Sequence, residues 1–130
     1  MRHGEALSPQ KDPERGLTDN GKFKIEQVAT HLKDSDVSFN QIFHSKKKRA
    51  RETAEIMGRI TSPKIHPVEL KHIAPNDDPH LPFVPNLMTL LTGQDAYLTA
   101  ISFETGTIVC LERNNKAGWN LNWSTSPSEI

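Results

Sequence analysis

Apolar residues recur with a helical period in two segments of the first half of the chain. The first segment begins after Thr18 or Asp19, either of which can cap a helix, and ends near Lys33. Its inward positions are three or four residues apart: Ile25, Val28, Ala29 and Leu32. The second segment ends at Ser62-Pro63, because the residue before a proline disfavours a helix. Its inward positions are Ala50, Thr53, Ala54, Met57 and Ile60.

The other apolar segments predict a third helix and several strands. The helix runs from about residue 82 to residue 91, with Pro82 suited to its first turn and Gly93 to its end. Pro67 confines one strand to an edge, and the predicted strands are residues 37–43, 64–70, 100–103, 107–112 and 119–123. Residues 114–118 form the loop of a C-terminal hairpin. Strands that alternate with helices and end in an antiparallel hairpin indicate an α/β fold in a single domain, residues 1–130.

Composition and charge exclude several classes of protein. The 130 residues include 16 Lys and Arg against 16 Asp and Glu, so the chain has no overall field to hold nucleic acid or an anionic membrane. No apolar run approaches the roughly 18 residues of a membrane span, and the first residues lack the apolar stretch of a signal peptide. A cytoplasmic location is therefore expected. The single cysteine, Cys110, can form neither an internal disulfide nor a thiolate metal site.

The six histidines suggest two kinds of site, of which the first would bind a metal ion. Three histidines and two aspartates are close in sequence: His66, His72, Asp77, Asp78 and His80. None of them has the four-residue spacing that places two ligands on one face of a helix. The sequence therefore predicts no metal site.

The second kind of site would bind an oxyanion. Arg2-His3-Gly4 places a guanidinium beside an imidazole, followed by a glycine that lets a ligand approach the backbone. Residues 45–53 read SKKKRARET at a strand-to-helix junction, where free N–H groups and the helix dipole favour a phosphate. His80 precedes the third helix. Such segments can meet at the carboxyl edge of an α/β sheet, which predicts a phosphate pocket there.

The basic run within this second segment has two other interpretations. It could be a solvated helix start, or a patch that binds nucleic acid. No nucleic-acid-binding motif or stacking aromatic accompanies it, so no nucleic-acid partner is expected. Its lysines, Lys46, Lys47 and Lys48, can steer an acidic phosphoprotein toward the pocket.

These motifs resemble the histidine phosphatase (phosphoglycerate mutase-like) superfamily, and within it the SixA-type phosphohistidine phosphatases. The resemblance is carried by Arg2-His3-Gly4, by S-x-x-x-R-A-x-x-T at residues 45–53 and by His80-Leu81-Pro82. Further similar segments are Gly16-Leu17-Thr18-x-x-Gly21, Phe103-Glu104-Thr105-Gly106 and Trp119-x-Leu121-x-Trp123. The resemblance implies a three-layer α/β/α fold with a mostly parallel central sheet. It also implies a metal-independent phosphatase that needs no cofactor.

The resemblance implies a role for each residue of the pocket. His3 would attack phosphorus and become a phosphohistidine that water then hydrolyses. Arg2 and Arg49 would hold the phosphoryl oxygens with their guanidinium groups, and His80 would donate to the same oxygens. The residues that would bind the substrate are Arg2, Gly4, Ser45, Arg49 and His80.

The general acid is the part of this site that the motifs do not supply. The candidates nearest in sequence are Glu69, Asp77 and Asp78, and the last two also suit a turn. A leaving imidazole has a pKa of about 6.5 and departs with little help, whereas a sugar or serine alkoxide needs an acid. We therefore expect a protein phosphohistidine as substrate, in a phosphotransfer domain of a signalling pathway. The alternatives are a phosphatase for small phosphate monoesters and a phosphate- or phosphoprotein-binding module.

The chain departs from this family at two places. Family members have an apolar strand before the R-H-G motif, whereas only Met1 precedes Arg2. They also have a helix and a buried strand before the second histidine, whereas residues 75–79 adjoin His80. Such a crossover takes at least a dozen residues plus its strand, so we expect segments to be absent before Met1 and near Pro79 and His80, the second of about 20–30 residues. Three helices with intact inward faces need a central sheet to cover them, which favours segments that are present but not recorded over segments that are lost.

Overall fold

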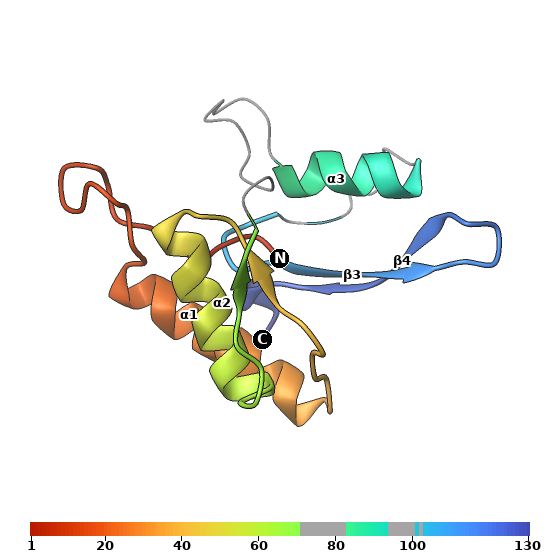
Figure 1. Ribbon diagram of the computed structural model, residues 1–130, viewed down its shortest axis with the longest axis horizontal. Coiled ribbons are helices and arrows are strands. Elements are labelled where there is room, and N and C mark those ends of the chain that lie inside the picture. The colour runs from red at the N-terminus through yellow and green to blue at the C-terminus, as the bar shows by residue number, and fades with distance from the viewer. Residues whose placement is uncertain (71–82, 94–100, 102) are drawn as a thin grey trace.

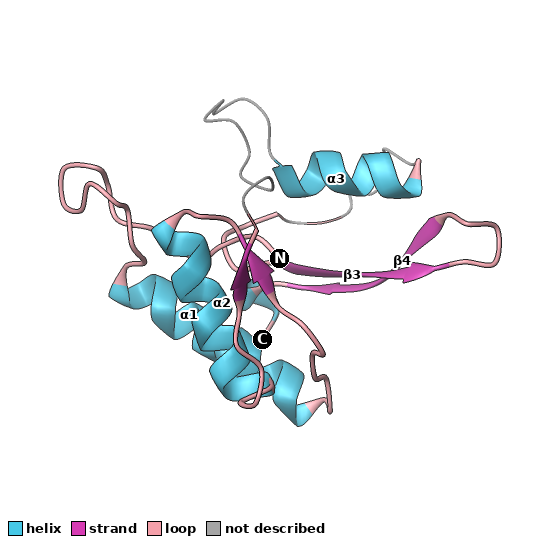
Figure 2. Ribbon diagram, in the orientation of Figure 1, coloured by secondary structure: helices cyan, strands magenta, loops and turns pink. Residues whose placement is uncertain are grey.

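The computed structural model describes residues 1–70, 83–93, 101 and 103–130. Helices and strands alternate through these residues, which confirms the predicted α/β class (Figures 1 and 2). The elements are α1 (Asp19–Asp34), β1 (Phe43–His44), α2 (Lys48–Thr61), β2 (Val68–Glu69), α3 (Phe83–Thr92), β3 (Ile108–Arg113), β4 (Trp119–Thr125) and the 3₁₀ helix η1 (Pro127–Glu129). α1 and α2 pack side by side, and the β3–β4 hairpin extends away from them, next to α3 (Figure 1).

α1 begins where the sequence predicts. Thr18 caps it through its side-chain oxygen, which accepts a hydrogen bond from the Gly21 N–H at 2.8 Å. The predicted inward residues are all buried: Ile25, Val28, Ala29 and Leu32. They form the hydrophobic core together with Met57 of α2 and Ile108 of β3. The core therefore lies between the two long helices and the first strand of the hairpin.

α2 presents the predicted inward residues to this core. Thr53, Ala54 and Met57 are buried, and Ala50 and Ile60 are half-buried. At the surface, Arg59 donates to Glu26 of α1 at 2.8 Å. A solvent-exposed ion pair contributes only about 0–1 kcal/mol, so burial of the apolar faces is what holds α1 and α2 together.

The described strands form two small sheets. β1 pairs with β2 in parallel, with His44 opposite Glu69. β3 pairs with β4 in antiparallel order, with a local irregularity between Cys110 and Leu111, which confirms the predicted C-terminal hairpin. Among the residues that the structure describes, the parallel part of the expected central sheet is the β1–β2 pair.

Two of the predicted strands are much shorter than expected. The strand predicted at residues 37–43 contributes only its last residue to β1, because the Phe39 N–H donates to the Ser62 side chain at 2.8 Å instead of to a strand. The strand predicted at residues 64–70 starts pairing only after Pro67, which has no N–H to donate. A hydrogen bond to the distant Ser62 therefore shortens β1, and Pro67 shortens β2.

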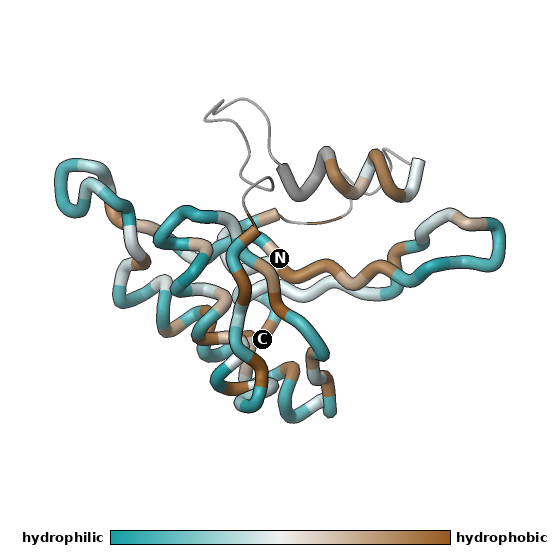
Figure 3. The backbone as a smooth tube through the Cα atoms, viewed as in Figure 1, coloured by the Kyte–Doolittle hydropathy of each residue, from teal (hydrophilic) through white to brown (hydrophobic). Residues whose placement is uncertain are grey.

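The C-terminal part of the chain follows its predicted pattern more closely. α3 covers most of the predicted span, and its Met88 is buried at 2% exposure. The strand predicted at residues 100–103 is wrong at its described residues, 101 and 103, which are not in a strand. The loop before α1 consists mostly of hydrophilic residues, whereas the first part of β3 consists mostly of hydrophobic residues (Figure 3). None of the described helices has the length and apolar character to cross a membrane.

Candidate active site

The N-terminal segment lies beside the start of β3. The Arg2 N–H donates to the Thr107 carbonyl at 2.9 Å, and the Gly106 N–H donates to the His3 carbonyl at 3.2 Å. Gly106 has a φ of 93°, a conformation that residues with a side chain disfavour. These two bonds fix the backbone of Arg2 and His3 against the sheet.

The imidazole of His3 is held at both ring nitrogens. Nδ1 lies 2.7 Å from the Gly4 carbonyl oxygen, and Arg49 Nε donates to Nε2 at 3.1 Å. A carbonyl oxygen only accepts hydrogen bonds, so Nδ1 carries the proton of the neutral ring and Nε2 carries a lone pair. His3 therefore presents an unprotonated nitrogen next to a guanidinium group.

Burial lowers the pKa of His3 below its usual value. The hydrogen bond to Gly4 opposes this effect, and the positive charges of Arg49, Arg2 and Arg15 lower the pKa further. Because the protonated form is disfavoured, the ring is neutral at pH 7. In that form Nε2 can act as a nucleophile.

A chain of two hydrogen bonds connects the N-terminal segment to α2. The Gly4 N–H donates to Thr53 Oγ1 at 3.1 Å, and Thr53 Oγ1 donates to the Arg49 carbonyl at 2.7 Å. A Cβ atom on Gly4 would lie 2.9 Å from the Ile25 side chain, so only glycine fits this close approach. The threonine and the glycine thereby set the position of His3 relative to Arg49.

The loop of residues 8–16 is attached to the start of α2 through Asp12. Its carboxylate accepts from Lys48 Nζ at 2.9 Å and from two N–H groups of its own loop at 2.9 and 3.0 Å. The lysine is the largest of the contributions that lower the pKa of Asp12 to about 2. One turn further along α2, Glu52 accepts from the Leu17 N–H at 2.6 Å. The loop and the helix that carries Arg49 are therefore bound together at two points.

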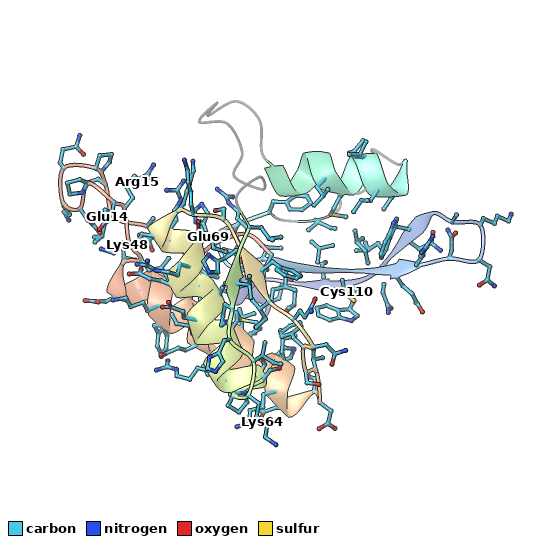
Figure 4. The ribbon with its side chains drawn as sticks, viewed as in Figure 1. Glu14, Arg15, Lys48, Lys64, Glu69 and Cys110 are labelled. Atoms are coloured by element: carbon cyan, nitrogen blue, oxygen red, sulfur yellow. The ribbon has the colours of Figure 1, made fainter. Side chains whose placement is uncertain are left out.

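An open cleft of about 340 Å³ lies between this loop and the start of α2. It is lined by Pro13, Glu14, Arg15, Lys46, Lys47, Lys48, Arg49 and Arg51. Arg15 has a φ of 54°, and its Nε donates to the Leu7 carbonyl at 3.2 Å. Of these lining residues, Glu14 and Arg15 of the loop and Lys48 of α2 lie near one another in Figure 4. Because Arg49 both lines the cleft and contacts His3, the cleft adjoins the imidazole.

The remaining predicted site residues of the described part lie around this centre. The Arg2 guanidinium donates to the Phe103 carbonyl. Ser45 is buried and directly follows β1. Glu69 is exposed at the end of β2, opposite His44, and therefore lies at the same end of the parallel pair as Ser45.

Four residues of the predicted oxyanion and metal sites lie outside the described residues: His72, Asp77, Asp78 and His80. His66 is described and is exposed. Within the described ranges, no three His, Cys, Asp or Glu side chains come together in a way that could hold a metal ion.

Three residues that organise the site were missed by the sequence reasoning, namely Asp12, Arg15 and Glu52. Charged residues in a loop that contains proline and glycine have the pattern of a solvated surface loop. One signal was available for Arg15, because it directly precedes the segment Gly16-Leu17-Thr18, which carries part of the family resemblance. Nothing in the sequence marks the pairing of Asp12 with α2.

Comparison with known proteins assigns the first half of the chain to a family. The model of the histidine phosphatase superfamily (branch 1) matches residues 1–72. The structure is similar to that of the protein histidine phosphatase SixA complexed with tungstate, with a TM-score of 0.81 and 26% sequence identity. The similarity covers 98% of this chain and 95% of that one. A comparison with proteins of curated function gives no significant match.

Two further solved structures share the fold. One is assigned as a phosphohistidine phosphatase SixA from Agrobacterium tumefaciens, with a TM-score of 0.79, 21% identity and coverage of 98% of this chain and 94% of that one. The other has the same assignment and comes from Nakamurella multipartitia, with a TM-score of 0.68, 18% identity and coverage of 98% and 93%. At these identities the likeness concerns the fold alone.

Proposed function

Because this chain belongs to the histidine phosphatase superfamily (branch 1), we propose that it removes phosphate from a phosphohistidine of a protein. The observation that supports this most directly is the contact of Arg49 Nε with the unprotonated Nε2 of His3, at 3.1 Å. The likeness to SixA complexed with tungstate supports it as well, because tungstate is a tetrahedral oxyanion like phosphate.

In the first step of the proposed reaction, the lone pair of His3 Nε2 attacks phosphorus. The bond between phosphorus and the substrate nitrogen breaks, and its electron pair leaves with the substrate imidazole, which departs neutral when its other nitrogen is protonated. The Arg49 guanidinium turns from Nε2 to the phosphoryl oxygens, where Arg2 and His80 also donate. The Nδ1 proton stays on His3, and its bond to the Gly4 carbonyl stabilises the charge of the phosphorylated ring.

In the second step, water attacks the phosphorus of the phosphorylated His3. The nitrogen–phosphorus bond breaks, its electron pair returns to Nε2, and phosphate is released. The hydrogen bonds from Gly4 to Thr53 and from Thr53 to Arg49 hold the backbones of the N-terminal segment and of α2 together, so His3 and Arg49 stay close through both steps. Ser45, which is buried after β1, would support the bound phosphate.

The general acid decides which substrates this site can use. Of the candidate acids, Glu69 is the one among the described residues; it is exposed at the end of β2, at the same end of the parallel pair as Ser45, and no hydrogen bond between described residues holds it at His3 as a proton donor. An imidazole leaving group needs little help from such a donor, whereas an alkoxide depends on it. We therefore infer that the substrate is a protein phosphohistidine, in a phosphotransfer domain of a signalling pathway.

Hydrolysis of two peptides of one sequence, with phosphohistidine in one and phosphoserine in the other, tests this function. We expect kcat/KM for the phosphohistidine peptide to be higher by about 100-fold or more, because a general acid contributes about 10²–10⁴-fold and only the serine alkoxide needs it. Phosphate release is measured. Turnover of the phosphoserine peptide alone would make the protein a monoesterase, and phosphate binding without turnover of either peptide would make it a binding module.

A further inference from the structure

The cleft between residues 8–16 and α2 concentrates positive charge. Of the eight described residues that line it, six are Lys or Arg and one is Glu. The whole chain has 16 basic and 16 acidic residues, so the remainder of the chain is net acidic. Of the six basic residues, Arg49 is the one that bonds to His3. The phosphoryl site therefore does not account for most of the charge in the cleft.

Acidic side chains of the described residues pair with some of these cations but not with all of them. Lys48 pairs with Asp12 at 2.9 Å, and Arg51 pairs with Glu55, one turn further along α2, at 3.8 Å. No carboxylate within the described part of the chain pairs with Lys46 or Arg15. Both side chains belong to exposed residues, and the partner of Arg15 is a neutral carbonyl. Two positive charges of the cleft thus face solvent without a carboxylate.

Most of these positive side chains lie at the N-terminus of α2, where positive charge destabilises a helix. α2 begins at Lys48 and has neither an acidic residue in its first turn nor a side-chain cap. Positive side chains at a helix N-terminus oppose the helix dipole and destabilise the helix. An anion bound in the cleft would reverse this effect and would also reduce the repulsion among the cations. An anionic partner would therefore stabilise this end of α2.

The shape and lining of the cleft favour an acidic polypeptide as that partner. Five of the eight described lining residues are exposed: Pro13, Glu14, Arg15, Lys46 and Arg51. The cleft is therefore open enough for an extended chain. None of the lining residues within the described ranges is aromatic, so these residues offer the bases of a nucleic acid no surface on which to stack. The cleft shares Arg49 with the site around His3, so a chain bound in the cleft can extend to the imidazole.

We propose that this cleft is a docking groove for an acidic segment next to the phosphorylated histidine of the substrate protein. The proposal rests on the proposed phosphatase function and adds a sequence preference to it. Lys46 and Arg15 supply the charges that no carboxylate of the described chain balances. Ion pairs in such an open groove are screened by salt, so the preference depends on ionic strength.

Two phosphohistidine peptides that differ only in their flanking residues test the proposal. One carries glutamates next to the phosphohistidine, and the other carries glutamines at the same positions. We expect kcat/KM for the glutamate peptide to be about 10-fold higher at low ionic strength. The preference should disappear at about 1 M salt, where the Debye length falls to about 3 Å.

Variants of Lys46 locate the preference in the cleft. Lys46→Gln should reduce the preference about threefold and Lys46→Glu should abolish it, while hydrolysis of the glutamine peptide stays unchanged. Lys64→Gln is the matched control, because Lys64 is also exposed but lies beyond the C-terminal end of α2, away from Lys48 and Arg15 (Figure 4). This control should keep the full preference.

Four results would contradict the proposal, and they can be told apart. Equal kcat/KM for the two peptides, or a preference that survives Lys46→Glu, would refute the groove and leave the phosphatase function intact. Hydrolysis of neither peptide would refute the phosphatase function itself. Stronger inhibition by a single-stranded oligonucleotide than by the unphosphorylated glutamate peptide would assign the cleft to nucleic acid instead.

Discussion

Replacement of His3 by alanine is expected to lower kcat/KM for a phosphohistidine peptide by about 10⁴-fold or more. The substitution removes Nε2, which is the atom that would form the bond to phosphorus. The remaining pocket can still bind phosphate, because Arg49 and the start of α2 are retained. The measurement is the rate of phosphate release at saturating and limiting peptide concentrations.

His31 provides the control for this substitution. It is an exposed histidine in the last turn of α1, and His31→Ala should leave kcat/KM within about twofold of the wild type. Urea unfolding of both variants checks that each retains the native fold. Activity that survives His3→Ala in a folded protein would exclude His3 as the nucleophile.

Arg49→Gln is expected to lower kcat/KM by about 10²–10³-fold, because it removes a charged donor from the phosphoryl oxygens. It should also raise the pKa of His3, since the Arg49 charge is one of the causes that lower it. Below its pKa the imidazole is protonated and cannot attack, so the acidic fall of the pH–rate profile should move to higher pH in this variant. An NMR titration of the His3 ring measures the pKa directly.

A further variant of Arg49 separates the charge of its side chain from its shape, and a variant of Arg59 serves as the control. Arg49→Lys keeps the positive charge but loses the planar fork, so it should lose activity while the pKa of His3 stays low. Arg59→Gln changes the same residue type near the other end of α2, where Arg59 contacts Glu26, and should leave activity and the His3 pKa unchanged. A His3 pKa that is the same in Arg49→Gln and in the wild type would contradict the proposed electrostatic role.

The helices were predictable because their apolar period reflects a single buried face. Ile25 and Val28 are fully buried, as their spacing predicts, and Thr18 caps α1 through its side chain. The short strands were less predictable, because strand length depends on partners that are distant in sequence. Phe39 illustrates this, since its N–H donates to Ser62, which lies 23 residues further along the chain.

Part of the site followed from motifs, and part followed only from the fold. The R-H-G and R-A-x-x-T motifs predicted that His3 and Arg49 belong to one pocket. In the structure, Arg49 Nε lies 3.1 Å from His3 Nε2. Thr53 was predicted as an inward helix residue, but its hydroxyl also links Gly4 to α2. The pairing of Asp12 with Lys48 joins residues 36 apart and has no signal in local sequence.

A trapped phosphoenzyme tests the central claim most directly. The protein is mixed with a phosphohistidine peptide, quenched rapidly in alkali, in which a nitrogen–phosphorus bond survives, and digested for mass spectrometry. We predict one phosphoryl group on His3 during turnover and none in His3→Ala. Turnover in which His3 carries no phosphoryl group, or in which another residue such as Ser45 carries it, would contradict the account.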